Sequence, residues 1–372
     1  MNQIKTITLS VLFLCLVTAA CKTPIETRQE DKYKDAIELS RMLVDSIQRT
    51  YKVPGMDVAV AIAGQTVWSE SFGLADVELN APVIAGQTRF RVGSVAKPLT
   101  AVALAKLMEA DRIDIDLPVQ VYVPYFPEKA YTFSTRQLSG HIAGIRSYQN
   151  NEFLNKKHYQ TVKEGLSMFM NDSLVYEPGT AYTYSSHGYN LLSAVIEGAS
   201  GEAFLPFMHK TIFRPLGMLS TCEDQNDSII SDRTSFYRLS RTDSLQIENA
   251  PYVDNSYKWA GGGFVSTTSD LIKFGEAMMQ PGFLSEPTLE EITTPQMLKN
   301  GKKTHYGIGW EIGRHGDKQV YGHGGGSVGG ITVFRIYPED QLVIVMLSNS
   351  SNTKYGEIPK LIVEAFLSEK RQ

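Results

Sequence analysis

Apolar residues recur at helical spacing near the start of the chain and at strand-like spacing directly afterwards. The periodicity over residues 36–50 predicts a helix. Two strand-like runs follow at 56–63 and 66–72, and the Gly64-Gln65 pair between them is typical of a hairpin turn. These segments predict an outer helix packed beside two antiparallel strands.

The far end of the chain resembles the beginning, whereas the middle does not. Further strands are predicted over 306–310, 319–321, 331–337 and 342–347, with a terminal amphipathic helix over 357–366. Helical periodicity dominates the middle, over 98–110, 162–170, 186–199 and 202–213. We therefore predict an α+β fold, with an antiparallel sheet flanked by helices and an inserted, mostly helical lobe. The sheet lobe is expected at 36–93 and 225–368, the helical lobe at 98–220, and a ligand cleft between them.

The first residues have the pattern of an export signal. Lys5 precedes an apolar stretch that runs through Val17, and small residues then lead to Cys21. The stretch is too short for a comfortable membrane span. We predict a signal peptide at 1–20, lipid attachment at Cys21 and a polar tether over 21–35. The mature protein would then be exported to the periplasm or cell surface and held at a membrane; the alternative is an uncleaved anchor.

Composition narrows the function further. The net charge of −4 and a pI near 6.0 leave no excess of basic residues for phosphates, so a nucleic-acid partner is not expected. Once the signal is removed, Cys222 is the one thiol left in the folded part, which excludes an internal disulfide. Cys222 is expected to be a small buried hydrophobe.

Ser94 and Lys97 stand three residues apart at the predicted start of a helix. Residues at this spacing share one helix face, so the amine can reach the hydroxyl. Backbone N–H groups at a helix start are also unpaired and can stabilise an oxyanion. A desolvated lysine with a lowered pKa can act as the base for a serine nucleophile. The same spacing at Ser351 and Lys354 falls in a polar loop, and a helix cap with a solvated lysine is the alternative for Ser94.

Two later segments carry polar groups that suit the same chemistry. Tyr184 precedes a predicted helix, and its phenol would relay a proton if Lys97 lowers its pKa. The other segment runs from His323 to Gly330 and is rich in glycine, which lets a backbone edge approach a ligand. The Gly326 N–H is predicted as the second oxyanion donor, and His323 as a contact for a substrate carboxylate. A core tyrosine and a plain glycine-rich hairpin are the alternatives.

In order and spacing, Ser94-x-x-Lys97, Tyr184-Ser-Ser186 and His323-Gly324-Gly325 resemble the three signature motifs of the serine β-lactamase and penicillin-binding protein family. This group includes class C β-lactamases, DD-peptidases and related esterases. The resemblance covers roughly residues 36–368, and the stretch 252–264 resembles the mitochondrial serine β-lactamase-like branch. It implies a β-lactamase/transpeptidase-like fold, a covalent acyl-enzyme at Ser94, an oxyanion hole of the Ser94 and Gly326 N–H groups, and substrate lying along 324–330.

Two departures from the family motifs bear on the substrate. Ser186 replaces an asparagine and is too short for the same amide contacts, while His323, Gly324 and Gly325 replace Lys-Thr-Gly and lose a permanent cation and a hydroxyl. If the pKa of His323 is unshifted, its contact with a carboxylate would weaken as the pH rises through about 6.5. We therefore expect a peptidase or esterase acting on a small peptide, amide or ester, with weak or no β-lactamase activity.

Single features of the sequence also occur in three other classes of protein. Gly325-x-Ser327-x-Gly329 fits an α/β-hydrolase elbow, but a strand is predicted after it where an elbow needs a helix. A zinc hydrolase is unsupported because the seven histidines show no metal-binding spacing, so neither a metal nor another cofactor is expected. A catalytically inert binding or scaffold protein with the same fold is the remaining alternative.

Overall fold

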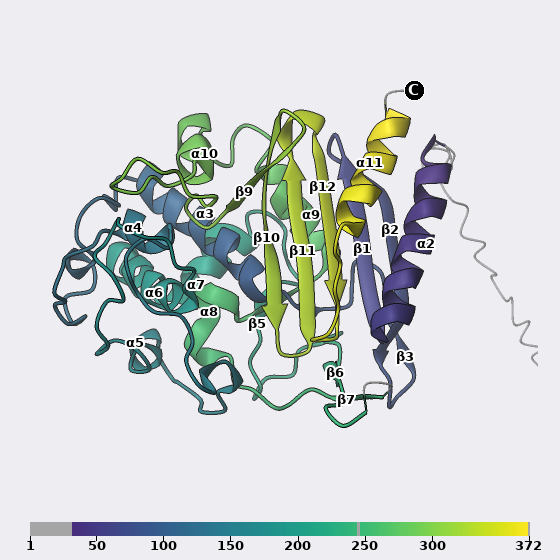
Figure 1. Ribbon diagram of the computed structural model, residues 1–372, viewed down its shortest axis with the longest axis horizontal. Coiled ribbons are helices and arrows are strands. Elements are labelled where there is room, and N and C mark those ends of the chain that lie inside the picture. Colours follow the sequence, from purple (N-terminus) through teal and green to yellow (C-terminus); the bar gives the residue numbers. More distant parts are fainter. Residues whose placement is uncertain (1–31, 244–245, 371–372) are drawn as a thin grey trace, which may run out of the picture.

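A seven-stranded antiparallel sheet forms one half of the molecule (Figure 1). The computed structural model describes residues 32–243 and 246–370. The strand order is β3-β2-β1-β12-β11-β10-β9, so the two ends of the chain meet where β1 pairs with β12. The strands are β1 (Gly55–Ile62), β2 (Gln65–Asp76), β3 (Ala81–Pro82), β9 (Glu311–His315), β10 (Lys318–Ser327), β11 (Gly330–Tyr337) and β12 (Leu342–Ser348).

Both faces of this sheet are covered. Helices α2 (Lys34–Tyr51) and α11 (Ile358–Lys370) pack together on one face, and α9 (Thr268–Ala277) covers the other (Figure 1). Alternate residues of β1 divide accordingly, since Val58 belongs to the core beneath α2 and Ala59 to the core beneath α9. Every residue of β1 and β12 is buried, which explains why both strands are apolar apart from Asp57 and Ser348.

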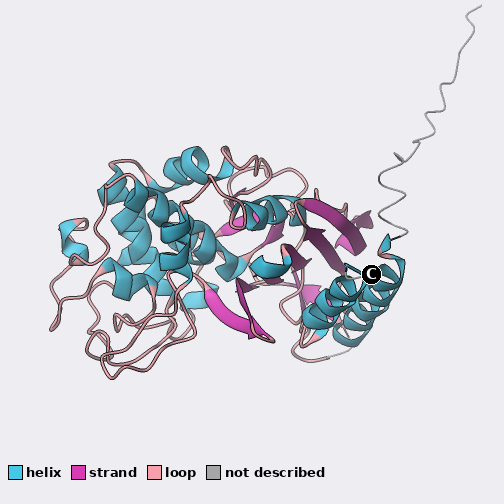
Figure 2. Ribbon diagram, turned by 90° about the horizontal axis from the view of Figure 1, so that it is seen from above, coloured by secondary structure: helices cyan, strands magenta, loops and turns pink. Residues whose placement is uncertain are grey.

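The helical half lies beside the sheet, as Figure 2 shows from above. Its central helix is α3 (Ala96–Glu109), in which even Lys97 is buried. Around it are α4 (Thr135–Ser139), α5 (Val162–Leu166), α6 (Ser186–Ser200), α7 (Phe204–Met208), a π-helix (His209–Phe213), α8 (Trp259–Gly262) and α10 (Glu286–Thr293). The short strands are β4 (Phe90–Arg91), β5 (Cys222–Glu223), β6 (Tyr237–Leu239), β7 (Ile247–Asn249) and β8 (Phe264–Ser266), and the 3₁₀ turns are Gly93–Val95, Val119–Val121, Glu152–Leu154, Ser256–Lys258 and Pro338–Asp340.

The predicted fold class is confirmed, with several local differences. Residues 306–310 form a buried turn instead of a strand, because Gly309 has a φ of +82° and the strand begins only at Glu311. Helix α5 ends at Leu166, short of the predicted 170. Strand β10 reaches Ser327, because its ladder with β11 continues through the glycines. Helices α8 and α10 pack on α3 although both follow residue 225.

Several predictions concern residues at or beyond the limits of the described chain. The signal peptide, Cys21 and all of the tether up to residue 31 lie outside the described residues. Among the described helices, no single one is long and apolar enough to cross a membrane; Ser186–Ser200 and Phe204–Phe213 pass that test only as a pair bent by 76°.

Cys222 is a half-buried free thiol, and burial raises its pKa to about 11.

Candidate active site

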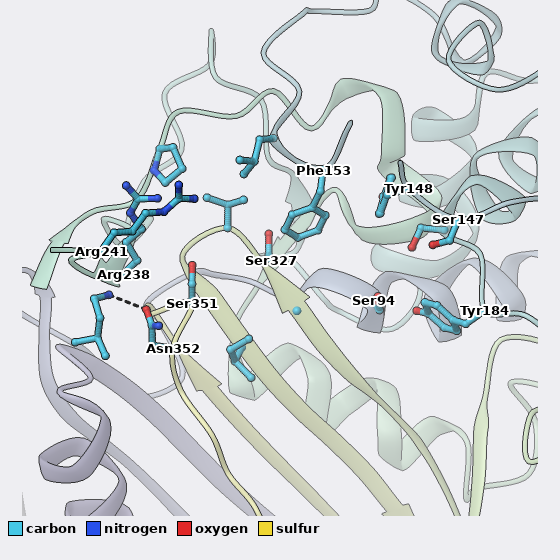
Figure 3. Close-up of a pocket in the computed structure, with 17 residues that line it drawn as sticks. Ser94, Ser147, Tyr148, Phe153, Tyr184, Arg238, Arg241, Ser327, Ser351 and Asn352 are labelled. Atoms are coloured by element: carbon cyan, nitrogen blue, oxygen red, sulfur yellow. Dashed lines mark hydrogen bonds between the residues drawn. The ribbon is translucent and has the colours of Figure 1, made fainter. Parts of the chain in front are cut away.

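The hydroxyl of Ser94 and the amine of Lys97 meet at the start of α3. Ser94 lies in the single turn Gly93–Val95 that leads into this helix, and Lys97 lies one turn further along. The Lys97 Nζ is 3.1 Å from the Ser94 Oγ. Ser94 also lines a groove of about 590 Å³, so its hydroxyl is accessible to a ligand while the lysine is not (Figure 3).

The surroundings of the Lys97 amine favour its neutral form. Burial holds its pKa well below the ordinary value, and the nearby Lys258 lowers it further. Besides Ser94, the nitrogen lies 2.7 Å from the Gly261 carbonyl and 3.3 Å from the Ser186 Oγ. A neutral amine has two N–H groups and one lone pair. It can therefore donate to Gly261 and Ser186 and still accept the hydrogen of Ser94.

Tyr184 brings a phenol to the same place. Its hydroxyl lies beside Ser94, and burial raises its pKa far above the usual value. The Lys97 nitrogen sits over the ring face, 4.8 Å from its centre, rather than at the hydroxyl. The condition set for a proton relay, that Lys97 lowers this pKa, is therefore not met. A protonated phenol suits donation of a proton to a leaving group.

The glycine-rich end of β10 forms the opposite wall. A Cβ added to Gly93 would come within 2.8 Å of the Gly326 nitrogen, and one added to Gly325 would come within 2.0 Å of the Val92 carbonyl, so the two backbones touch. A Cβ on Gly324 would meet nothing within 4 Å, which shows that this side of the strand faces open space. Since β9 pairs with β10 only as far as Gly322, the backbone edge beyond it is free of a neighbouring described strand.

His323 is placed differently from the prediction. Its side chain is only 1% exposed, and its two ring nitrogens lie 2.5 Å from the Gly324 carbonyl and 2.8 Å from the Tyr306 hydroxyl. Because a carbonyl only accepts, Nδ1 carries the hydrogen and Nε2 accepts from Tyr306. Burial lowers the pKa of His323 to about 4, although Glu311 nearby opposes this. The ring is thus neutral and has no free edge for a substrate carboxylate.

This placement predicts how His323 affects activity. We expect the pH dependence of kcat/KM to have the same shape in the wild type and in His323→Gln between about pH 5.5 and 8, because a group with a pKa of about 4 does not titrate there. The Gln amide oxygen can accept from Tyr306, so the loss in kcat/KM should be only about threefold. A fall in wild-type kcat/KM near pH 6.5 that is absent in the variant would contradict this prediction. It would instead support contact between His323 and a substrate carboxylate.

The sequence pointed to no role for the other groove residues. The wall opposite β10 comes from loops that carry Ser147, Tyr148, Phe153 and Leu154, and the far end carries Arg238 and Arg241 (Figure 3). Lys258 and Gly261, which surround the Lys97 amine, lie in the stretch 252–264, which resembled the family without pointing to a role for either residue.

Two alternatives from the sequence do not fit the structure. Ser351 accepts from the Gly329 N–H at 2.7 Å while Lys354 is exposed, so the second serine-lysine pair forms no dyad. Ser327 ends β10 and is followed by β11, whereas a hydrolase elbow needs a helix there. Over residues 32–243 and 246–370, no group of three His, Cys, Asp or Glu side chains is placed to hold a metal ion.

The fold and this constellation are those of the penicillin-recognising serine hydrolases, and comparison with known proteins agrees. The chain belongs to the Beta-lactamase family, whose model matches residues 40–365. The human mitochondrial serine beta-lactamase-like protein LACTB is 35% identical, over 82% of this chain and 72% of that protein. A penicillin-binding protein of Bacillus subtilis (strain 168) is 31% identical, over 81% of this chain and 69% of its own length.

Solved structures show the same architecture. The octameric penicillin-binding protein homologue from Pyrococcus abyssi superposes with a TM-score of 0.75 at 25% identity, covering 89% of this chain and 77% of that one. The D-amino acid amidase from Ochrobactrum anthropi SV3 gives 0.78 at 22% identity over 90% and 99% of the two chains, a likeness of fold alone. The predicted family and the predicted class of enzyme, a β-lactamase-related serine hydrolase, are confirmed.

Proposed function

We propose that the chain is an exported serine hydrolase that cleaves a peptide, amide or ester through a covalent acyl-enzyme at Ser94. One observation carries the proposal. A buried amine with a lowered pKa lies 3.1 Å from an accessible hydroxyl, opposite a backbone edge bare of side chains. If Ser94 were only a helix cap, the Lys97 side chain would be expected to remain solvated and charged at the surface, whereas it is buried.

The proposed acylation uses each group once. Lys97 takes the Ser94 proton as the Oγ bonds to the substrate carbonyl carbon, and the resulting oxyanion faces the N–H groups of Ser94 and Gly326. Tyr184 then gives its proton to the leaving group as the carbonyl re-forms, and the proton held by Lys97 returns to the phenolate. Water attacks the acyl-enzyme with Lys97 again as base, which restores Ser94. Substrate would lie antiparallel to β10 and pair with it at Gly326, because both backbone groups of Gly324 are already used: its N–H donates to the Glu311 Oε2 at 3.2 Å and its carbonyl accepts from His323.

The groups around this dyad favour peptides, amides or esters over β-lactams. Ser186 approaches Lys97 but offers a hydroxyl in place of an amide, and the buried His323 supplies no cation to the groove. Some relatives have names of the same kind: a D-aminopeptidase from Brucella anthropi is 26% identical over 76% of this chain. These facts support an acyl substrate with weak or no β-lactamase activity.

Export is proposed from the N-terminal residues alone. The apolar stretch that ends at Cys21 supports cleavage before that cysteine, lipid attachment to it and a periplasmic or cell-surface location. Mass spectrometry of the mature N-terminus, isolated from the membrane fraction of a bacterial host, tests this location. Recovery of a chain that still begins at Met1 would contradict it.

The proposed nucleophile is tested by intact-mass analysis after exposure to a fluorophosphonate. We expect one adduct per chain on the wild type and on Ser368→Ala, a matched control at an exposed serine of α11, and none on Ser94→Ala. Digestion should place the adduct on the peptide that contains Ser94, not on the one that contains Ser351. An adduct on Ser94→Ala would overturn the assignment. A wild type that neither reacts nor hydrolyses any ester or peptide would instead favour an inert binding protein.

A further inference from the structure

The groove continues well beyond Ser94 and ends at two arginines. Figure 3 shows Arg238 and Arg241 at one end of the groove, Ser94 and Tyr184 at the other, and Phe153 between them. The described residues that line this groove include these two guanidinium groups and no aspartate or glutamate. Arg238 is paired with Glu248, which lies outside the lining, so Arg241 supplies the unpaired positive charge at this end of a chain whose net charge is −4.

Arg238 is held in place by hydrogen bonds that connect its strand to the strand with the Gly326 edge. Arg238 lies in β6, which is hydrogen-bonded to the loop after β12: Tyr237 N–H donates to the Asn349 carbonyl at 2.9 Å, and Leu239 N–H donates to the Asn352 Oδ1 at 2.7 Å. Ser351, in the same loop, accepts from Gly329 in the turn between β10 and β11. The arginine end is therefore tied to the strand that carries Gly326.

The two guanidinium groups retain free hydrogen-bonding capacity. The Arg238 Nε donates to Glu248 at 2.7 Å, which uses one of its five N–H groups. Arg241 is exposed, and no carboxylate of residues 32–243 or 246–370 forms an ion pair with it. A guanidinium group with two free N–H groups on one side commonly binds a carboxylate or phosphate through two parallel hydrogen bonds.

The stretch between the two ends is mostly apolar, with Ser327 as a polar side chain beside Phe153 (Figure 3). Phe153, Leu154, Val328 and Ile331 line it, so a ligand that spans the groove would place an uncharged segment there. We propose that Arg238 and Arg241 form a subsite for an anionic group, so that this enzyme prefers acyl substrates that carry a carboxylate or phosphate separated from the scissile carbonyl by an apolar segment. This inference rests on the proposed hydrolase activity and assigns its substrate class.

The test uses p-nitrophenyl esters of straight-chain acids that end in a carboxylate, a phosphate, a carboxamide or an ammonium group, at several chain lengths. A second series carries the same groups on the phenol side of the ester, because either part of the substrate can occupy the arginine end. In one series and at one length, we expect wild-type kcat/KM to favour an anionic ester over its carboxamide by about tenfold, and to disfavour the ammonium ester. The anionic ester with the higher kcat/KM shows whether the subsite prefers a carboxylate or a phosphate.

The variants decide whether the arginines cause this preference. In Arg241→Gln, the ratio of anionic to carboxamide kcat/KM should fall about tenfold, mainly through KM, while Arg241→Lys should retain part of it. Arg49→Gln, at an exposed arginine of α2, is the control and should keep the wild-type ratio. An unchanged ratio in Arg241→Gln, or no anionic preference in either series, would overturn the subsite. Failure of the hydrolase proposal is distinct, because then no ester is cleaved and Ser94 takes no fluorophosphonate.

Discussion

Replacing Lys97 with Met is expected to lower kcat/KM by at least about a thousandfold, because the variant keeps the buried volume and loses the base. Among the described residues, this amine is the one basic group that hydrogen-bonds to the Ser94 hydroxyl, at 3.1 Å. Without it, the hydroxyl would have to attack with its proton still in place. The measurement is steady-state hydrolysis of an activated ester by purified wild type and variant.

The pH dependence distinguishes a base from a merely structural lysine. Burial lowers the pKa of Lys97, so the amine accepts a proton at neutral pH and loses this ability as the pH falls through its lowered pKa. Wild-type kcat/KM should therefore fall toward acid pH, and the residual activity of Lys97→Met should lack that limb. Lys360→Met removes an exposed lysine of α11 and should stay within about twofold of the wild type. A Lys97→Met rate within about tenfold of the wild type would remove Lys97 from the mechanism.

The parts of this site that the sequence predicts are those that depend on short spacing. Ser94 and Lys97 share one turn of α3, and the contact between them follows from helix geometry alone. The glycines after His323 likewise signalled a backbone edge open to a ligand, and Gly324 does face open space. In the sheet, apolar runs at both ends of the chain predicted strands that the structure pairs as β1 and β12.

What the sequence does not predict depends on orientation and burial. A histidine at position 323 could in principle bind a carboxylate, but in β10 its ring is buried against Tyr306 and does not face the groove. Tyr184 was expected beside a cation, yet the desolvation that neutralises Lys97 also raises the pKa of the phenol. These pKa shifts depend on how deeply each group is buried, which the residue types alone do not reveal.

The position of the arginine end of the groove depends on contacts between residues far apart in the chain, so the sequence does not predict it. Leu239 of β6 bonds to Asn352, 113 residues later in the chain, and this contact has no local signature. The segment around Arg238 and Arg241 is polar and short of periodicity, and no helix or strand is predicted there. Only the folded arrangement brings these two side chains into the same groove as Ser94.

Asp224→Ala is expected to destabilise the protein by about 3–5 kcal/mol, measured by urea unfolding near neutral pH. The Asp224 carboxylate is fully buried and accepts from Arg91 Nε at 2.6 Å, Arg233 at 2.9 Å and Asn255 at 2.8 Å. Removing it leaves the buried Arg91 cation without a counter-charge. Asp45→Asn breaks an exposed ion pair with Arg49 and serves as the control, with an expected change below about 1 kcal/mol.

Acid pH and a second substitution test the cause of this loss. Although burial opposes it, the arginines hold the pKa of Asp224 below its ordinary value, so its contribution to stability is present at neutral pH and is lost as the pH falls through that lowered pKa. The difference between wild type and Asp224→Ala should therefore shrink toward strongly acid pH. Combining Arg91→Met with Asp224→Leu should recover part of the stability, because no lone charge then remains at the Arg91 position. No recovery would mean that lost packing, not an unpaired cation, is the cause.

The same network predicts that activity is more sensitive than stability. Arg91 comes three residues before Ser94, and its guanidinium also donates to the Val328 carbonyl at 2.8 Å, just beyond the Gly326 edge. It thus ties the nucleophile's strand to the β10 edge that bears the proposed oxyanion donor. Since oxyanion stabilisation depends on sub-ångström placement of its donors, the doubly substituted protein should fold yet hydrolyse esters at least about tenfold more slowly than the wild type. Wild-type rates in that folded variant would show that the site is positioned by other contacts.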